Sequence, residues 1–250
     1  MQNNTLEYVL RLGDSSIIIG HRLSQLCGHG PVLEEDIATT NIALDFIGLG
    51  TNLLDYAADL QGNGATADTL AFMRGERHYK NLLITELPNG DFAFTTVRQF
   101  LFDVYQLYLY EGLTRSNDER LRNIALKSYK EIQYHVRHTA AWMLRLGDGT
   151  TESHERMQTA LNELWAYTGE FFAADAVDSE LLTNGVAPDL SAVHSKWLTH
   201  VSDIITQATL TLPTSTFAQS GSREGKHSEH LGFLLAEMQY LPRMYPDAKW

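Results

Sequence analysis

Apolar residues recur every three to four positions along most of this chain, which is the spacing of one face of an α-helix. The most regular stretch covers residues 121–147, with a capping-box signal at Ser116 and Glu119 before it and a glycine stop at Gly147. The six prolines leave long tracts between them, as long helices require. The sequence contains no alternating pattern long enough to build a sheet. These features predict an all-α chain.

The order of the apolar stripes predicts a ferritin-like four-helix bundle, in which a crossover separates two pairs of long helices. We therefore expect a single domain over residues 1–250, with a core bundle at about 5–147 and additional C-terminal helices at about 151–241. The last of these is expected to stop at Pro242. The predicted helices cover residues 5–27, 32–60, 68–80, 91–114, 121–147, 151–172, 190–208 and 227–241.

Charge and cysteine content restrict the possible partners and the compartment. A net charge of −12 argues against nucleic acid and against an anionic membrane surface. Cys27 is the only cysteine, which favours a reducing compartment and an inert, buried thiol rather than a nucleophile. The N-terminal residues lack the pattern of a signal peptide, and no continuous apolar run approaches the ~20 residues that span a bilayer. We expect a cytoplasmic protein that contacts no membrane.

Two glycines, Gly48 and Gly50, lie inside the second predicted helix. Each costs roughly 1 kcal/mol against alanine in a helix interior. Either another helix approaches closely there, or the chain tolerates a local weakness. The sequence does not decide between these two explanations.

A di-iron bundle requires a carboxylate on each of two helices and Glu-x-x-His on each of the other two. Here Asp45 is followed at the third position by Gly48, and Glu131 by Tyr134. Residues 15–27 of the first predicted helix contain no carboxylate at all. We therefore expect no metal and no catalytic residue, and expect Glu131, Tyr134 and His135 to form a buried, hydrogen-bonded remnant.

Two alternatives stay open at this point. The first is a self-sufficient di-iron carboxylate enzyme that uses Asp45, Asp103, Glu131 and His135, because residues four apart also share a helix face. The second is a plain helical interaction protein. Another basic cluster, formed by Arg223, Lys226, His227 and His230, is interpreted as a surface that contacts other subunits.

Several motifs together resemble the C-type family of phenylacetyl-CoA 1,2-epoxidase subunits, over nearly the whole chain. The matching stretches are LRLGDS, CGHGPVLEEDIATTNIALDFIGLGTNLLDYAADL, DTLAFMRGERHYKNLLITELPNGDFA, SYKEIQYHVRH and GKHSEHLGFLLAEMQYLPRMYP. The resemblance implies a ferritin-like fold and a place in a multicomponent bacterial monooxygenase of aerobic phenylacetate catabolism. It also implies a non-catalytic structural subunit that has lost its metal ligands.

The same resemblance implies the partners and cofactors. The catalytic di-iron centre belongs to a paralogous A subunit that pairs with this chain. Electrons arrive from a separate reductase that uses NADPH, FAD and an iron–sulfur cluster, so no cofactor is expected in this subunit. We expect an obligate heteromeric interface larger than ~2,000 Å².

The substrate implied by the resemblance is a CoA thioester, whose phosphates are anionic. The densest cationic run is Arg74-Gly-Glu-Arg77-His78-Tyr79-Lys80, and by itself it favours a solvated helix end. With the resemblance, we expect CoA contact at Arg77, His78, Tyr79 and Lys80, through phosphate-binding cations and an aromatic ring that stacks on adenine. The resemblance implies a second contact at Asp178, Ser179 and Glu180, through main-chain groups.

Overall fold

The structure, a computed structural model, describes residues 2–246 and residue 248. Every regular element in this part of the chain is helical, so the predicted all-α, ferritin-like fold class is confirmed. The contacts divide the chain into two compact units. The first unit runs up to Pro88 and resumes at Gly221, and the second unit comprises Asn89–Ser220. Each unit is described separately below.

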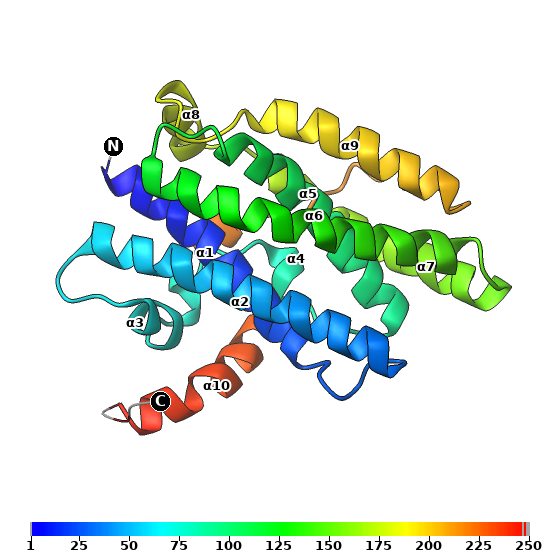
Figure 1. Cartoon of the computed structure of the whole chain (residues 1–250), viewed down its shortest axis with the longest axis horizontal. Coiled ribbons are helices and arrows are strands. Elements are labelled where there is room, and N and C mark those ends of the chain that lie inside the picture. The colour runs from blue at the N-terminus through cyan, green and yellow to red at the C-terminus, as the bar shows by residue number, and fades with distance from the viewer. Residues whose placement is uncertain (1, 247, 249–250) are drawn as a thin grey trace. The chain divides into compact units, whose positions relative to one another are not determined.

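The first unit is built on an antiparallel pair, α1 (Gln2–Ser24) and α2 (Leu33–Gln61) (Figure 1). The two helices approach closely at Gly50, where an added Cβ would lie 2.6 Å from Cγ1 of Ile17. At Gly48 an added Cβ would meet nothing within 4 Å. Close helix packing inside this chain therefore explains Gly50 but not Gly48.

Four further helical segments and the C-terminal helix complete the first unit. The predicted helix at residues 68–80 is shorter than expected and ends at Phe72, because the chain is extended at Gly75. The C-terminal helix continues through Pro242 to Met244, and the prediction of a stop was wrong, since the N–H of Tyr245 still bonds to the carbonyl of Leu241 at 3.0 Å. These segments are α3 (Ala67–Phe72), η1 (Glu76–His78), α4 (Leu83–Glu86), η4 (Ser222–Glu224) and α10 (Glu229–Met244).

The second unit is built on another antiparallel pair, α5 (Phe92–Leu113) and α6 (Glu119–Gly147). Asp118 caps α6 by accepting the N–H of Leu121 at 2.9 Å, so the predicted capping box at Ser116 was wrong. The Ser116 hydroxyl instead donates to the carbonyl of Val186 at 2.7 Å. The unit also contains α7 (Thr151–Leu164), η2 (Trp165–Tyr167), η3 (Gly169–Phe172), α8 (Ala176–Thr183) and α9 (Leu190–Gln207).

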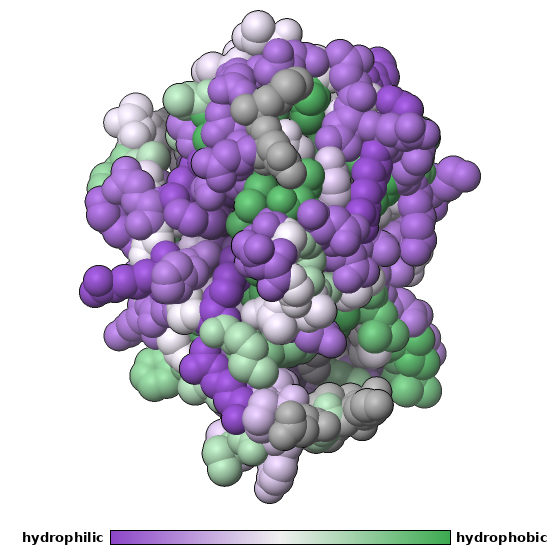
Figure 2. Space-filling view, turned by 90° about the vertical axis from the view of Figure 1, so that its left-hand side faces the viewer, coloured by the Kyte–Doolittle hydropathy of each residue, from purple (hydrophilic) through white to green (hydrophobic). Residues whose placement is uncertain are grey.

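The surface combines hydrophilic side chains with separate hydrophobic patches (Figure 2).

Two findings, the exposure of Cys27 and the apolar character of α2, differ from the predictions made from the sequence. Cys27 is exposed, because α1 ends at Ser24 and leaves the cysteine in the following turn. By length and composition α2 is the one described helix that could cross a membrane. Of its most apolar 18-residue stretch, 39% is buried inside the protein.

Candidate functional site

The basic segment, residues 74–80, connects α3 to α4 in the first unit and contains the turn η1. Arg77 and His78 are exposed, Lys80 is half-buried, and the Tyr79 side chain is completely buried. Two of the four side chains expected to contact CoA are therefore exposed, and Lys80 is exposed in part.

Asp14 anchors the basic segment from within. Its buried carboxylate accepts two hydrogen bonds from the Arg74 guanidinium, one of them 3.0 Å long, and a third from the main-chain N–H of Lys80 at 2.9 Å. The guanidinium also lies over the Tyr79 ring, 4.5 Å from its centroid. Burial raises the pKa of the Tyr79 phenol, and the charge of Asp14 adds to this effect. The positive charge of Arg74 is thus paired with the Asp14 carboxylate inside the first unit.

Tyr79 and Lys80 have structural contacts as well. The Tyr79 hydroxyl donates to the carbonyl of Ala71, and with its ring buried the side chain is not available to stack on adenine in this conformation. The Lys80 ammonium donates to the carbonyl of Arg223 at 2.7 Å and lies 3.9 Å from the Glu7 carboxylate. Of the four residues, Arg77 and His78 are the ones that this conformation leaves at the surface.

A buried cluster that the sequence reasoning missed lies behind the basic segment. The Glu86 carboxylate is 2.9 Å from Nδ1 of His227 and also accepts from the side-chain amide of Asn81 and the N–H of Ser228. The other ring nitrogen of His227 lies 3.0 Å from the Tyr79 carbonyl. Both ring nitrogens face acceptors, so the geometry favours the doubly protonated imidazolium.

The electrostatics of this cluster agree with its geometry. Burial by itself lowers the pKa of His227, but the hydrogen bond and negative charge of Glu86 outweigh burial and raise that pKa above its ordinary value. Both side chains have 0% exposure. The expectation that His227 belongs to a surface for other subunits was therefore wrong, because the ring turns inward to its carboxylate partner.

The second predicted contact, at residues 178–180, lies in the second unit, on α8. Asp178 is buried, and its carboxylate accepts the N–H of Asp175 at 3.0 Å in a capping box. The Ser179 hydroxyl donates to the Asp175 carbonyl at 2.8 Å, and Glu180 is half-buried. The acidic side chain of Asp178 therefore caps a helix.

The second unit contains the remainder of a metal-site pattern on α5 and α6. Asp103 is fully buried and accepts hydrogen bonds from Gln99 at 2.6 Å and Thr139 at 3.3 Å. Burial raises the pKa of Asp103 to about 7, although the nearby His135 and these two hydrogen bonds act in the opposite direction. The partners of this carboxylate are thus an amide, a hydroxyl and an imidazole.

The expected buried remnant at Glu131, Tyr134 and His135 was partly wrong. His135 is 1% exposed, whereas the Tyr134 side chain is 42% exposed and Glu131 is half-buried. Successive residues on a helix are rotated by about 100°, so Tyr134 and His135 cannot share the buried face. The Tyr134 ring instead stacks beside His138, with 6.1 Å between ring centroids.

The side chains present do not fit a di-iron centre. Among the described residues, no group of three or more histidine, cysteine, aspartate or glutamate side chains comes together to hold a metal ion. Of the four ligands in the di-iron alternative, Asp103, Glu131 and His135 belong to the second unit and Asp45 belongs to the first. In the second unit, amide and hydroxyl groups occupy positions around Asp103 where a metal site would need further carboxylates.

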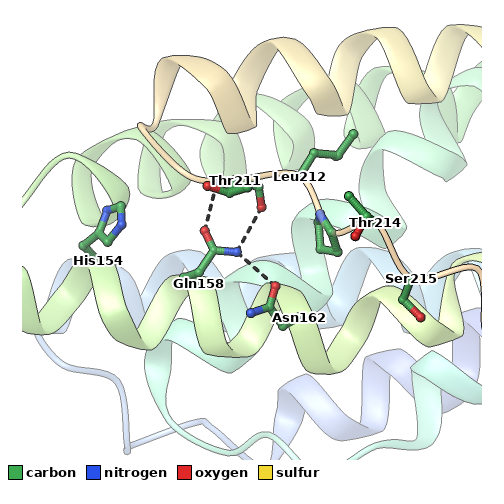
Figure 3. Close-up of a pocket in the computed structure, with 8 residues that line it drawn as sticks. His154, Gln158, Asn162, Thr211, Leu212, Thr214 and Ser215 are labelled. Atoms are coloured by element: carbon green, nitrogen blue, oxygen red, sulfur yellow. Dashed lines mark hydrogen bonds between the residues drawn. The ribbon is translucent and has the colours of Figure 1, made fainter.

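A hollow of about 500 Å³ in the second unit offers a different chemistry. Three side chains of α7 point toward the extended segment 211–215, namely His154, Gln158 and Asn162 (Figure 3). The Gln158 amide binds both main-chain groups of Thr211, at 2.8 and 2.9 Å. The residues that line this hollow include no lysine or arginine, so it lacks the charge that phosphates require.

Two comparisons with known proteins bear on this geometry. The phenylacetic acid catabolic protein family matches residues 1–250. The C subunit of the 1,2-phenylacetyl-CoA epoxidase of Escherichia coli (strain K12) is 44% identical over 248 residues, which cover 99% of this chain and 100% of that protein.

Proposed function

The chain belongs to the phenylacetic acid catabolic protein family and has a role in phenylacetate catabolism, and we propose that it is the non-catalytic structural subunit of a phenylacetyl-CoA epoxidase. In this role it pairs with a catalytic di-iron protein and contributes to binding of the CoA thioester. The similar E. coli protein is one subunit of an epoxidase, and a subunit implies partners.

The observation that carries the proposal is the composition of the buried polar cluster on α5 and α6. A dinuclear site needs carboxylates and histidines from several helices. Here Asp103 and His135 are buried, but Gln99 and Thr139 satisfy the Asp103 carboxylate and Tyr134 turns outward. This donor set supports a paralogue of a catalytic subunit that keeps the helices and has exchanged the ligands.

Iron analysis tests the non-catalytic role. We expect the isolated chain to bind much less than one iron per molecule, and the assembled epoxidase to retain its iron when this chain carries Glu131→Ala. Glu155→Ala, at an exposed position of α7 outside the proposed ligand set, serves as the matched carboxylate control. Stoichiometric iron in the isolated chain that Glu131→Ala removes would establish the di-iron alternative instead.

The proposed CoA contact rests on the exposed side of the basic segment. Arg77 and His78 are at the surface, and the half-buried Lys80 ammonium lies beside them in sequence. Arginine binds phosphate through two parallel N–H groups, which suits the diphosphate of CoA. The internal contacts of Arg74 and Tyr79 hold the main chain of this segment, so they support the contact without forming it.

Replacing both Arg77 and Lys80 with alanine is expected to raise the KM for phenylacetyl-CoA about tenfold in the assembled enzyme. Charge-assisted hydrogen bonds contribute ~1.5–3 kcal/mol each, and exposure reduces this value. The effect should weaken as ionic strength rises, with kcat and iron content unchanged.

The matched control for this experiment is Lys130→Ala with Arg137→Ala, which removes the same charge from exposed positions on α6. Thermal unfolding of each variant checks that losing the contact of Lys80 with the Arg223 carbonyl leaves the first unit folded. An unchanged KM at low ionic strength, with an intact complex, would remove the basic segment from the CoA site.

Pairing with another protein is supported by the outer face of α2, which we define as Leu33, Ile37, Leu44 and Gly48. The first three side chains are 70%, 52% and 59% exposed. They recur at helical spacing on the side of α2 away from α1, and the open position at Gly48 continues the same face. An exposed apolar stripe of this kind is typical of a helix that packs against a partner protein.

A further inference from the structure

The C-terminal helix α10 has two apolar faces. One is buried in the first unit and includes Leu231, Leu234 and Leu235. The other, which we call the outer seam, consists of Phe233, Ala236, Tyr240 and Met244. The three large side chains of the seam are 72%, 60% and 56% exposed. Their three-to-four spacing is that of the contact line between two packed helices.

Opposite charges mark the two ends of the outer seam. Glu229 lies in the first turn of α10 and Arg243 in the last turn, and both are exposed. At 1.5 Å per residue they are about 21 Å apart along the helix axis. Arg243 donates to the carbonyls of Phe72 and Arg74, at 3.3 and 3.1 Å. Within the described residues neither charge forms an ion pair.

We propose that α10 packs antiparallel against α10 of a second copy of this chain, about a two-fold axis near Ala236. This orientation places Glu229 of each copy beside Arg243 of the other. Two-fold symmetry therefore gives two pairs of opposite charges. A parallel pairing would place like charges together at both ends of the seam. Glu237, one residue from the axis, is directed to its own chain, where its carboxylate accepts a hydrogen bond from the Gln25 amide at 3.5 Å. Antiparallel packing also brings the positive end of one helix dipole beside the negative end of the other.

A hollow of about 370 Å³ lies along one side of the seam. Gly75 and Glu76 form one wall, and Ala236 and Tyr240 are among the α10 residues that form the other. In the antiparallel register, Phe233 of the second copy lies opposite positions 239–240, at the edge of this hollow. The hollow can therefore receive an aromatic ring, as a hole receives a knob in helix packing.

The size of the contact limits its strength. α10 has 16 residues and is about 24 Å long, so two such helices bury less than the ~1,200 Å² of a typical stable interface. We therefore expect a weak, concentration-dependent dimer of this chain that a larger assembly can incorporate. The inference does not depend on the proposed function.

Charge reversal tests the pairing in the full-length chain by sedimentation velocity. We expect Glu229→Arg and Arg243→Glu each to raise the dimer dissociation constant about tenfold, because two-fold symmetry turns one reversal into two repulsive pairs. The double variant should return the constant to the wild-type value. Glu155→Arg, Arg137→Glu and their combination are the charge-matched controls, since both positions are exposed on other helices.

A cross-link distinguishes this contact from self-association through another surface. In a chain carrying Cys27→Ser, Glu229→Cys and Arg243→Cys, the two new thiols are about 21 Å apart within one chain, too far for an internal disulfide. Oxidation should give a covalent dimer whose disulfide joins position 229 to position 243. A double reversal that fails to restore association, or a disulfide that joins position 229 to position 229, would overturn the proposal.

Discussion

Replacing Glu86 with alanine is expected to lower the free energy of unfolding of this chain by about 3–5 kcal/mol. The substitution leaves the imidazolium of His227 buried without its counter-charge. It also removes the acceptor of the Asn81 amide and of the Ser228 N–H. Urea denaturation followed by far-UV circular dichroism measures the change.

A second Glu→Ala substitution provides the control for this prediction. Glu152 forms an ion pair with Arg156 that is 2.7 Å long, but its side chain is 75% exposed. Solvent screens such a pair, so we expect no measurable loss of stability in Glu152→Ala. Equal effects of the two substitutions would show that the burial of the Glu86–His227 pair has no energetic consequence.

The Glu86–His227 pair also predicts a dependence on pH. The pKa of His227 is raised in the folded state, so its contribution to stability is complete below the unfolded-state value of about 6.5. The contribution is lost as the pH rises through the folded-state pKa. The difference in unfolding free energy between wild type and Glu86→Ala should therefore narrow above about pH 6.5. A difference that stays constant from about pH 6 to 9 would contradict a protonated His227.

Replacing Leu44 with aspartate is expected to weaken assembly with the catalytic subunit by roughly a hundredfold or more, without unfolding the chain. Leu44 is 59% exposed in the isolated chain. A charge placed at the centre of a dehydrated apolar contact costs several kcal/mol, which is the size of a hot-spot effect. Co-purification and gel filtration of the two proteins measure the loss. Leu126→Asp, at a residue of α6 that is 49% exposed, is the matched control.

Gly48 allows a sharper version of the same experiment. An added methyl group meets nothing within 4 Å in this chain, so Gly48→Ala should stabilise the isolated protein by about 1 kcal/mol. The same methyl group should weaken assembly if a partner helix approaches closely there. Gly50→Ala should instead destabilise the isolated protein, because its Cβ would lie 2.6 Å from the Ile17 side chain. Unimpaired assembly of both Leu44→Asp and Gly48→Ala would place the interface elsewhere.

The long helices could be predicted from the sequence because their apolar period is strong, but side-chain orientation within α6 could not. The apolar stripe includes Tyr129 and Ala140, whereas the buried face also contains the polar residues Ser128, His135 and Thr139. The expected burial of Tyr134 came from its spacing to Glu131, which resembles Glu-x-x-His, and not from the apolar periodicity. The short helix α8 was missed, although Asp175 and Asp178 form a capping box that signals its start.

The buried cluster at Glu86 could not be derived from local patterns. Its partner His227 is 141 positions away in the sequence, and no periodicity connects two such residues. A glutamate inside the mainly apolar run 81–87 was the available signal, because a buried charge requires a partner. The same argument applies to Lys80, whose contact with Arg223 spans 143 positions.

The division of the first unit between the two ends of the chain determines the order in which it can fold during synthesis. A single hydrophobic cluster of this unit joins Ile18 and Tyr79 to Leu231, Leu234 and Leu235. Residues 89–220 emerge from the ribosome before those three leucines emerge. The second unit can therefore form while the first still exposes part of its apolar surface, and the first closes only when α10 arrives.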